Sequence, residues 1–123
     1  MPKDARLRKP AEFRTVYGGG RRFEGRLATV FLLPNGLEQH RFGITASRKM
    51  SRLAVKRNRA KRLLREAFRL TACELDGLSR RYDWVFNARR SIVQEKVGAV
   101  ITDLQRIIAQ VKSKEEAACE TEK

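Results

Sequence analysis

The sequence is poor in the residues that build disulfides, metal sites and acid–base catalysis. Its 123 residues include two cysteines and a single histidine. Cys73 and Cys119 are far apart, and a metal site made from two thiols would lack its other ligands, so we expect two reduced thiols. His40 lies beside a predicted turn without a visible carboxylate or cysteine partner, and we expect a solvated turn residue rather than a general acid or base. These absences favour a protein that has no catalytic residues and no metal site of its own.

Long apolar runs and nucleotide-binding loops are absent as well. No stretch approaches the roughly 20 apolar residues that a membrane-spanning helix needs, and no apolar signal-peptide segment follows the basic start at residues 1–6. The glycines at 18–20 are not followed by the Gly-Lys-Ser/Thr sequence of a P-loop. Hydrophobic residues make up 41% of the chain, which is enough for one modest core. We therefore expect a single-domain cytoplasmic protein with no membrane partner.

Acidic residues are scarce relative to basic ones. The chain has 28 lysines and arginines against 14 acids, which gives a formal net charge of +14. This excess implies an anionic partner, with nucleic acid the first candidate and an acidic membrane surface the second. The charge is concentrated in residues 48–69, where Glu66 is the only acid. The basic residues of this window are Arg48, Lys49, Arg52, Lys56, Arg57, Arg59, Lys61, Arg62, Arg65 and Arg69.

Hydrophobic periodicity and turn residues predict a mixture of helices and strands. Helices are expected over residues 10–17, 53–75 and 93–111, and strands over residues 26–33, 41–47 and 83–88. The Pro-Asn-Gly turn at 34–36 predicts that the first two strands pair as an antiparallel hairpin. A sheet with helices packed against it would bury these faces, so the expected class is α+β. We expect one RNA-binding domain over residues 1–112 and a disordered charged tail over residues 113–123.

The basic helix has one apolar face and one strongly charged face. The face expected to pack on the sheet carries Ala60, Leu64, Ala67 and Thr71, and the opposite stripe carries Asn58, Arg62, Arg65 and Arg69. Like charges at this spacing destabilise an isolated helix by a few tenths of a kcal/mol per pair, which a polyanion would relieve. No dimerisation heptads, zinc ligands or helix-turn-helix spacing accompany the helix, so structured RNA fits better than DNA. Asn58 could contact a base edge or a 2′-hydroxyl, or it could form only a local bond on the helix surface.

The order of motifs along the chain identifies a family. Residues 41–49 (Arg-Phe-Gly-Ile-Thr-Ala-Ser-Arg-Lys) and residues 54–69, centred on Arg57-Asn58-Arg59, closely resemble the bacterial ribonuclease P protein component. Residues 7–17 resemble the first helix of that family and its lead-in, and residues 83–89 resemble its late strand, which ends in Ala-Arg. The resemblance covers residues 6–111. Two departures are a loop at 50–53 that is one residue longer than usual and Asn87, which stands in a strand that is usually more aliphatic.

The resemblance implies both a fold and a function. The family fold is an α/β sandwich of a four-stranded sheet and three helices, with a left-handed βαβ crossover that departs from the general right-handed rule. Members bind a catalytic RNA, and this holoenzyme removes the 5′ leader of precursor tRNA. The RNA supplies the active site and holds most of the Mg²⁺, so the protein is implied to be a non-catalytic subunit that needs no protein partner. The alternative is a general RNA-binding or ribosome-assembly protein with no processing role.

The resemblance also implies two RNA-facing surfaces. The ten basic residues of the 48–69 window and Asn58 are expected to contact the catalytic RNA. A cleft between the first helix and the sheet is expected to hold the single-stranded leader, and its candidate residues are Arg6, Arg8, Lys9, Phe13, Arg14, Tyr17 and Phe31. Aromatic rings there would stack on unpaired bases of any sequence. The three aromatic residues could instead be ordinary core residues, and the four basic ones could be solvated surface.

Overall fold

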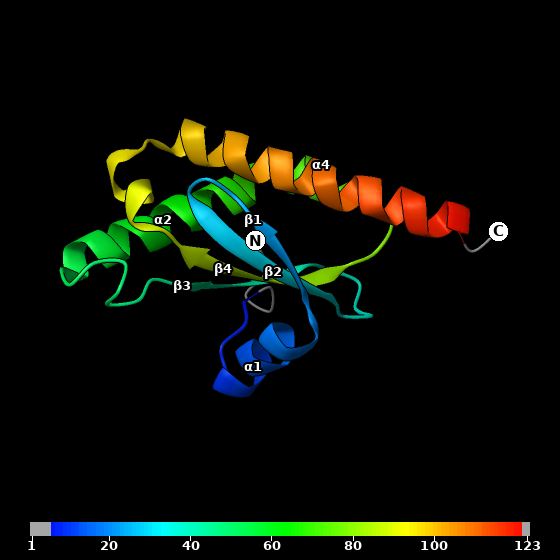
Figure 1. Ribbon diagram of the computed structural model, residues 1–123, viewed down its shortest axis with the longest axis horizontal. Coiled ribbons are helices and arrows are strands. Elements are labelled where there is room, and N and C mark those ends of the chain that lie inside the picture. Colours follow the sequence, from blue (N-terminus) through cyan, green and yellow to red (C-terminus); the bar gives the residue numbers. More distant parts are fainter. Residues whose placement is uncertain (1–5, 122–123) are drawn as a thin grey trace.

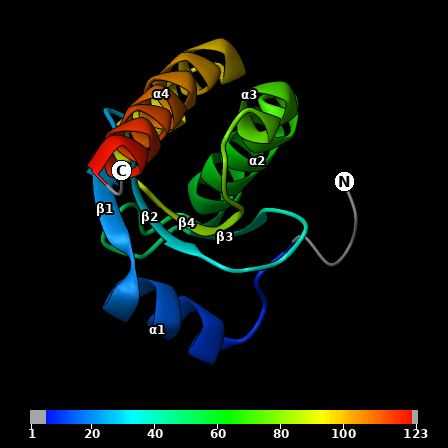
Figure 2. The same ribbon diagram turned by 90° about the vertical axis from the view of Figure 1, so that its right-hand side faces the viewer.

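The computed structural model describes residues 6–121, which form a four-stranded mixed sheet with helices on both faces. The elements are α1 (Pro10–Gly19), β1 (Arg21–Glu24), β2 (Ala28–Pro34), β3 (Arg41–Thr45), α2 (Ala54–Leu70), α3 (Ala72–Asp76), β4 (Tyr82–Ala88), the 3₁₀ helix η2 (Arg90–Gln94) and α4 (Val97–Thr121) (Figure 1). Figure 2 shows α2 and α4 side by side over one face of the sheet and α1 alone over the other. None of the described helices is long and apolar enough to cross a bilayer.

The sheet order is β1-β2-β4-β3, so the expected hairpin between β2 and β3 is wrong. Strand β4 lies between them, antiparallel to β2 and parallel to β3. The turn after β2 bonds to the start of β4 instead, because Asn35 donates its backbone N–H to Arg81 O and its Nδ2 to Asp83 Oδ1, both at 3.0 Å. Helices α2 and α3 connect β3 to β4 and thus form the βαβ crossover that the resemblance implies. The left hand of that crossover stays a prediction.

Alternate residues of β4 build two unequal cores. Trp84 and Phe86 belong to the large cluster under α2 and α4, and both are at most 1% exposed. Val85 points the other way, into a small cluster with Leu7 and Val16 under α1. A strand buried on both faces is expected to be a nearly continuous apolar run, which is what residues 84–86 are. The small cluster leaves the α1 face of the sheet only partly covered.

Helix α2 buries the face that its periodicity predicts, but it ends earlier than expected. Its buried residues are Ala60, Leu64, Ala67 and Phe68. Thr71, which is fully buried, donates its hydroxyl to Ala67 O at 3.0 Å and to Phe68 O at 3.1 Å. This bonding to the preceding turn competes with helix continuation, and the predicted helix over 53–75 is therefore divided into α2 and the one-turn α3.

Two further elements, β1 and the end of α4, differ from expectation. The strand β1 was not predicted, because only Phe23 of its four residues is buried and the segment is otherwise polar. The tail from residue 113 was expected to be disordered, but α4 continues to Thr121. Glu115 anchors this part of the helix, since its carboxylate accepts the N–H groups of Ser79 (2.9 Å) and Arg80 (3.2 Å). Cys73 is exposed and free, whereas the side chain of Cys119 lies outside the described part.

His40 is a buried core residue and not the solvated turn residue that its sequence position suggested. It is 8% exposed, and its Nδ1 accepts hydrogen bonds from Tyr82 N at 3.1 Å and Trp84 Nε1 at 3.0 Å. Its Nε2 lies 3.1 Å from Leu75 O, to which it donates. This arrangement fixes the neutral ring with the proton on Nε2, because two donors already face Nδ1. Burial is the main cause that lowers the pKa of His40.

Because the pKa of His40 is lowered on folding, we predict that the protein loses stability in weak acid. Below the unfolded pKa of about 6.5 the unfolded histidine binds a proton that the folded one refuses, so stability falls as the pH drops toward the folded pKa. The free energy of unfolding, measured in urea between pH 7.5 and 5, should fall over this range. His40→Gln should be less stable at pH 7.5 by about 1–3 kcal/mol and should show a flatter pH profile. A constant difference between the two proteins at every pH would contradict this role.

Candidate nucleic-acid interface

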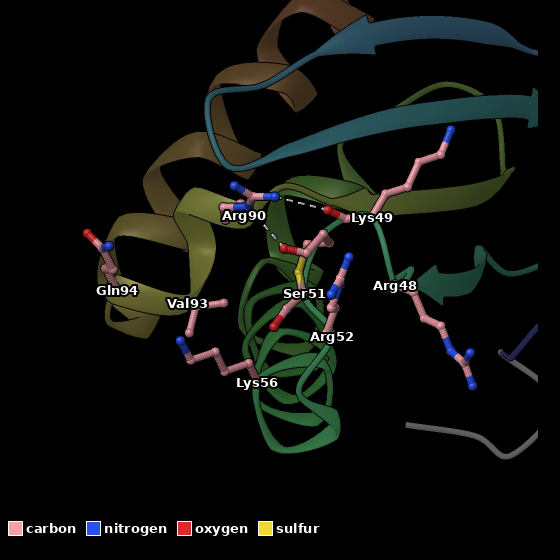
Figure 3. A pocket seen from close by; sticks show the side chains of 9 residues that line it. Arg48, Lys49, Ser51, Arg52, Lys56, Arg90, Val93 and Gln94 are labelled. Atoms are coloured by element: carbon pink, nitrogen blue, oxygen red, sulfur yellow. Dashed lines mark hydrogen bonds between the residues drawn. The ribbon is translucent and has the colours of Figure 1, made fainter.

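Four of the predicted RNA-binding residues surround a hollow beside the start of α2. It has a volume of about 650 Å³, and its basic lining residues are Arg48, Lys49, Arg52, Lys56 and Arg90 (Figure 3). The first four come from the loop after β3 and the first turn of α2, as the sequence predicted. Arg90 comes from η2 and was not predicted, because only the fold brings residues 48–52 next to the end of β4. All five side chains are exposed.

Three arginines brace this surface by donating to backbone carbonyls. Arg57 Nη1 donates to Ser51 O at 3.0 Å and to Arg52 O at 2.9 Å. Arg59 donates from Nε to Val93 O and from Nη2 to Glu95 O, each at 3.0 Å, and so ties α2 to the end of η2 and to the residue that follows it. Arg90 donates to Met50 O and Lys49 O, each at 3.3 Å. The loop at 48–52 is therefore held from both sides by guanidinium groups.

The remaining polar residues of α2 differ in whether their side chains already have hydrogen-bond or ion-pair partners within the protein. Asn58 and Arg62 are exposed, and no side-chain hydrogen bond involves either of them within the described residues. Lys61 and Arg65 are half-buried, and Arg65 Nε is buried without an acceptor. Arg69 forms a two-point ion pair with Glu66, and this hydrogen bonding lowers the pKa of Glu66. Arg69 is thus the member of the predicted set whose charge is partly neutralised within the protein.

The aromatic residues that were predicted to line a leader-binding cleft lie between α1 and the sheet. Phe13 lies against Gly43, where a Cβ atom would approach the Phe13 ring to within 2.4 Å, so this close contact needs glycine. Tyr17 packs edge-on against Phe31 with ring centroids 5.0 Å apart. Phe13 and Phe31 are half-buried and pack against the small cluster, whereas Tyr17 is 38% exposed. Phe13 and Phe31 are therefore partly buried members of the small core, and their stacking on the leader stays a prediction.

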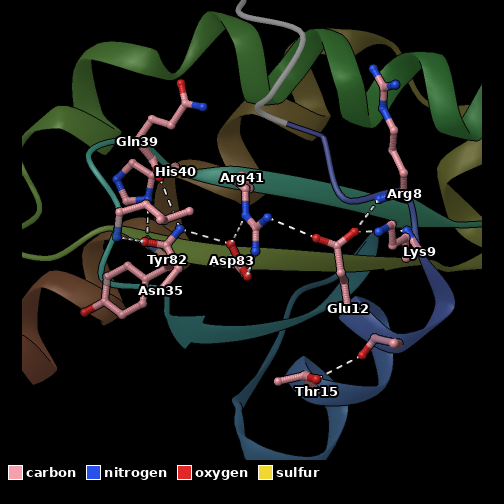
Figure 4. Close-up of polar contacts among 12 residues, drawn as sticks. Arg8, Lys9, Glu12, Thr15, Asn35, Gln39, His40, Arg41, Tyr82 and Asp83 are labelled. Carbon is pink, nitrogen blue, oxygen red and sulfur yellow. Dashed lines mark hydrogen bonds and ion pairs between the residues drawn. The ribbon is translucent and has the colours of Figure 1, made fainter.

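A chain of ion pairs fixes α1 over this cleft (Figure 4). Arg41 contacts both oxygens of Asp83, at 2.8 Å from Nε and 2.6 Å from Nη2, and contacts Glu12 Oε2 at 3.0 Å from Nη1. Glu12 also accepts the N–H groups of Arg8 (3.1 Å) and Lys9 (3.0 Å), as in a helix capping box. These backbone bonds are the main cause that lowers the pKa of Glu12, and Arg41 adds to it. The first turn of α1 is thus attached to the two strands that line the cleft.

The four basic residues predicted for the cleft lie in α1 or in the segment that leads into it. Arg6, Arg8, Lys9 and Arg14 are all exposed. Arg6 forms a parallel bridge with Phe42, and the next residue, Leu7, donates its N–H to Phe42 O at 2.8 Å. This segment therefore lies along the free edge of β3 and leads into α1. A contact of these cations with the leader stays a prediction.

A polar row crosses the sheet beside the aromatic residues. Thr29, Asn87 and Thr45 lie opposite one another on β2, β4 and β3. Asn87 accepts hydrogen bonds from Tyr17 and Thr45, and Arg89 Nη2 donates to Thr29 Oγ1 at 3.1 Å. Beyond this row β3 and β4 run directly into the residues of the basic hollow. The polar row bonded to Tyr17 and the basic hollow therefore both lie at the carboxyl ends of these two strands. Among the described residues, no group of three or more histidine, cysteine, aspartate or glutamate side chains could hold a metal ion.

Comparisons with known proteins give one consistent result. The family model described as Ribonuclease P matches residues 1–112. The Ribonuclease P protein component of Caldanaerobacter subterraneus subsp. tengcongensis is 35% identical over 106 residues, which cover 86% of this chain and 88% of that protein. Among solved structures, a mutant RNase P protein from Staphylococcus aureus has a TM-score of 0.76 at 26% identity, covering 89% of this chain and 90% of the other. The RNase P protein from Thermotoga maritima has a TM-score of 0.73 at 25% identity, covering 85% and 96%.

Proposed function

Because this chain belongs to the bacterial ribonuclease P protein family, and is thus a protein component of a ribonucleoprotein, we propose a different RNA ligand for each of its two surfaces. The basic surface around the start of α2 binds the catalytic RNA, and the cleft under α1 binds the 5′ leader of precursor tRNA. The observation that carries the proposal is that the basic surface and the polar row beside the aromatic residues both lie at the carboxyl ends of β3 and β4. An RNA strand can follow such a path without leaving the protein.

The basic surface suits a folded RNA with a fixed shape. Its arginines and lysines meet few acids, and Arg57, Arg59 and Arg90 are used to hold the backbone of the loop and of η2 in place. A rigid set of cations matches phosphates at fixed positions and loses little side-chain freedom on binding. Affinity for RNA should therefore depend on salt, because each neutralised phosphate releases counterions.

The cleft suits a single strand of variable sequence. Tyr17 offers an accessible ring, and Arg22 lies over the Phe31 ring at 5.8 Å. Stacking on such rings contributes about 1–3 kcal/mol per base and is tolerant of sequence. Asp83 and Glu12 neutralise Arg41 beneath the first turn of α1, so phosphates would contact the exposed cations Arg6, Arg8, Lys9 and Arg14 instead. This arrangement supports a leader that stacks on the floor and runs its backbone along the edge.

Within this proposal the protein is a non-catalytic subunit of a cytoplasmic endoribonuclease. The catalytic RNA provides the active site and holds most of the Mg²⁺, and the reaction leaves the mature 5′ end of tRNA. The protein contributes binding energy and orientation, which accelerate a reaction by fixing the scissile bond against the catalytic groups. Both RNAs are therefore its partners, one permanent and one as substrate.

Arg62→Ala should weaken binding to the catalytic RNA without unfolding the protein. Arg62 is exposed on α2 and forms no hydrogen bond or ion pair within the described residues, so its loss should cost about 1–2 kcal/mol of binding free energy. It should also reduce the slope of log K against log salt by about 1. Filter binding over a salt series measures both quantities. Lys112→Ala, which removes an exposed cation from α4, is the control. An unchanged slope for Arg62→Ala would place Arg62 outside the interface.

Tyr17→Leu should weaken binding of precursor tRNA to the holoenzyme more than binding of mature tRNA. Leucine preserves apolar cover over Phe31 but removes the accessible aromatic ring, so the loss should be about 1–3 kcal/mol on leader-bearing substrate only. Leu37→Ala, at an exposed loop residue, is the control. Affinities of both tRNA forms for the reconstituted holoenzyme give the comparison. An equal loss of affinity for precursor and mature tRNA would contradict binding of the leader in the cleft.

A further inference from the structure

Asn87 is an amide that directly follows the buried apolar run of residues 84–86 in β4. It lies on β4, one residue beyond Phe86, and faces α1 as Val85 does. Its neighbours across the sheet are Thr29 on β2 and Thr45 on β3. The stacking role proposed above for Tyr17 and Phe31 does not use it.

The carbonyl end of this amide is fully occupied within the protein. Asn87 Oδ1 accepts from the Tyr17 hydroxyl at 2.7 Å and from Thr45 Oγ1 at 2.5 Å. A carboxamide oxygen has two lone pairs, so these two donors satisfy it. They also fix the rotation of the amide plane, since both come from elements that pack on β4.

The amino end of the same amide is unoccupied and reachable. No hydrogen bond involves Asn87 Nδ2 among the described residues, and Asn87 is only half-buried. Among the half-buried and buried residues that the structure describes, Arg65 Nε is the only side-chain nitrogen or oxygen that is shielded from solvent and has no hydrogen-bond partner. Asn87 Nδ2 also has no partner, so it must be in contact with solvent. It is therefore a donor held in a fixed direction, next to an exposed tyrosine ring.

The surroundings of this donor match one unpaired nucleotide. The Tyr17 ring is 38% exposed, and a base stacked on it would bring its edge toward the hydroxyl end of the ring, where Asn87 sits. Arg89, bonded to Thr29 at the other end of the row, offers a cation for the phosphate. Ring, amide and guanidinium thus supply the three kinds of contact that a nucleotide accepts.

We propose that Asn87 reads the base of one leader nucleotide through its amino group. The inference rests on the proposed binding of the leader in this cleft and adds a preference to it. The amino group of Asn87 can only donate hydrogen bonds, so it distinguishes bases by the exocyclic group that it contacts at C6 of a purine or C4 of a pyrimidine. At this position guanine and uracil carry a carbonyl oxygen that accepts, whereas adenine and cytosine carry an amino group that does not. The site therefore prefers keto bases to amino bases at a single position of the leader.

The test uses holoenzyme reconstituted with the catalytic RNA and precursor tRNAs in which each leader position carries all four bases in turn. Affinity is measured for the wild-type protein and for the Asn87→Val and Asn87→Asp variants, with leaderless tRNA as reference. The wild type should prefer guanine and uracil at one position by about 3- to 10-fold, the range of one neutral hydrogen bond. Asn87→Val should flatten this preference at that position alone.

Asn87→Asp provides the sharper comparison, because it replaces the donor by an acceptor of the same shape. The carboxylate still accepts from Tyr17 and Thr45, and its charge weakens all substrates alike, so the ratio between bases is the readout. That ratio should reverse toward adenine and cytosine. A base profile shared by all three proteins, or no preference in the wild type, would overturn the role of Asn87 while leaving leader binding intact. Equal affinity of the wild type for leader-bearing and leaderless tRNA would instead overturn the proposed function.

Discussion

The position of β4 between β2 and β3 is the constraint on which the rest of the structure depends. The strand is paired on both sides and buried on both faces, so its alternate residues must satisfy two different layers. Trp84 and Phe86 complete the large core under α2 and α4. Asp83, Val85 and Asn87 face α1, where they anchor Arg41, close the small core and form the polar row. One strand thereby joins the large core under α2 and α4 to the small core and polar row under α1.

Charge in this protein has two distinct uses. Arg57, Arg59 and Arg90 donate to backbone carbonyls, and Arg41 is neutralised by two carboxylates. Such groups shape the loop at 48–52 and the orientation of α1. Other cations, among them Arg52, Lys56 and Arg62, lie exposed on the surface that these braces hold. A count of basic residues in the sequence cannot distinguish the two uses, because the carbonyl partners of Arg59 and Arg90 are at least 34 residues away.

Much of the fold follows from local patterns in the sequence. The apolar face of α2, the buried run of β4 and the helix after Pro10 all come from periodicity and flanking residues, and the structure confirms them. The errors share a cause, which is that the deciding contact is distant in sequence. His40 is buried because Tyr82 and Trp84 donate to it, β3 pairs with β4 across the α2 crossover, and Glu115 attaches the last turns of α4 to Ser79. No window of neighbouring residues contains both partners of any of these pairs.

The residues of the candidate site were proposed from the sequence, and their role in RNA binding stays a prediction. The sequence indicated the aromatic set and the basic window, and the structure brings each set together. It did not indicate that Arg69 is paired with Glu66 or that Arg90 lines the basic hollow. It also did not indicate that Asn87 accepts a hydrogen bond from Tyr17. Asn87 was noticeable as an amide in an otherwise apolar strand, but its meaning depends on which face of the sheet it occupies.

The most direct test of the account is a cleavage reaction. Precursor tRNA with a 5′ leader is incubated with the cognate catalytic RNA at low millimolar Mg²⁺, with and without this protein, and the products are mapped to the nucleotide. The account predicts that the protein strongly stimulates a single cut at the mature 5′ end. Binding of the protein to both RNAs without any change in the rate or position of cleavage would contradict it.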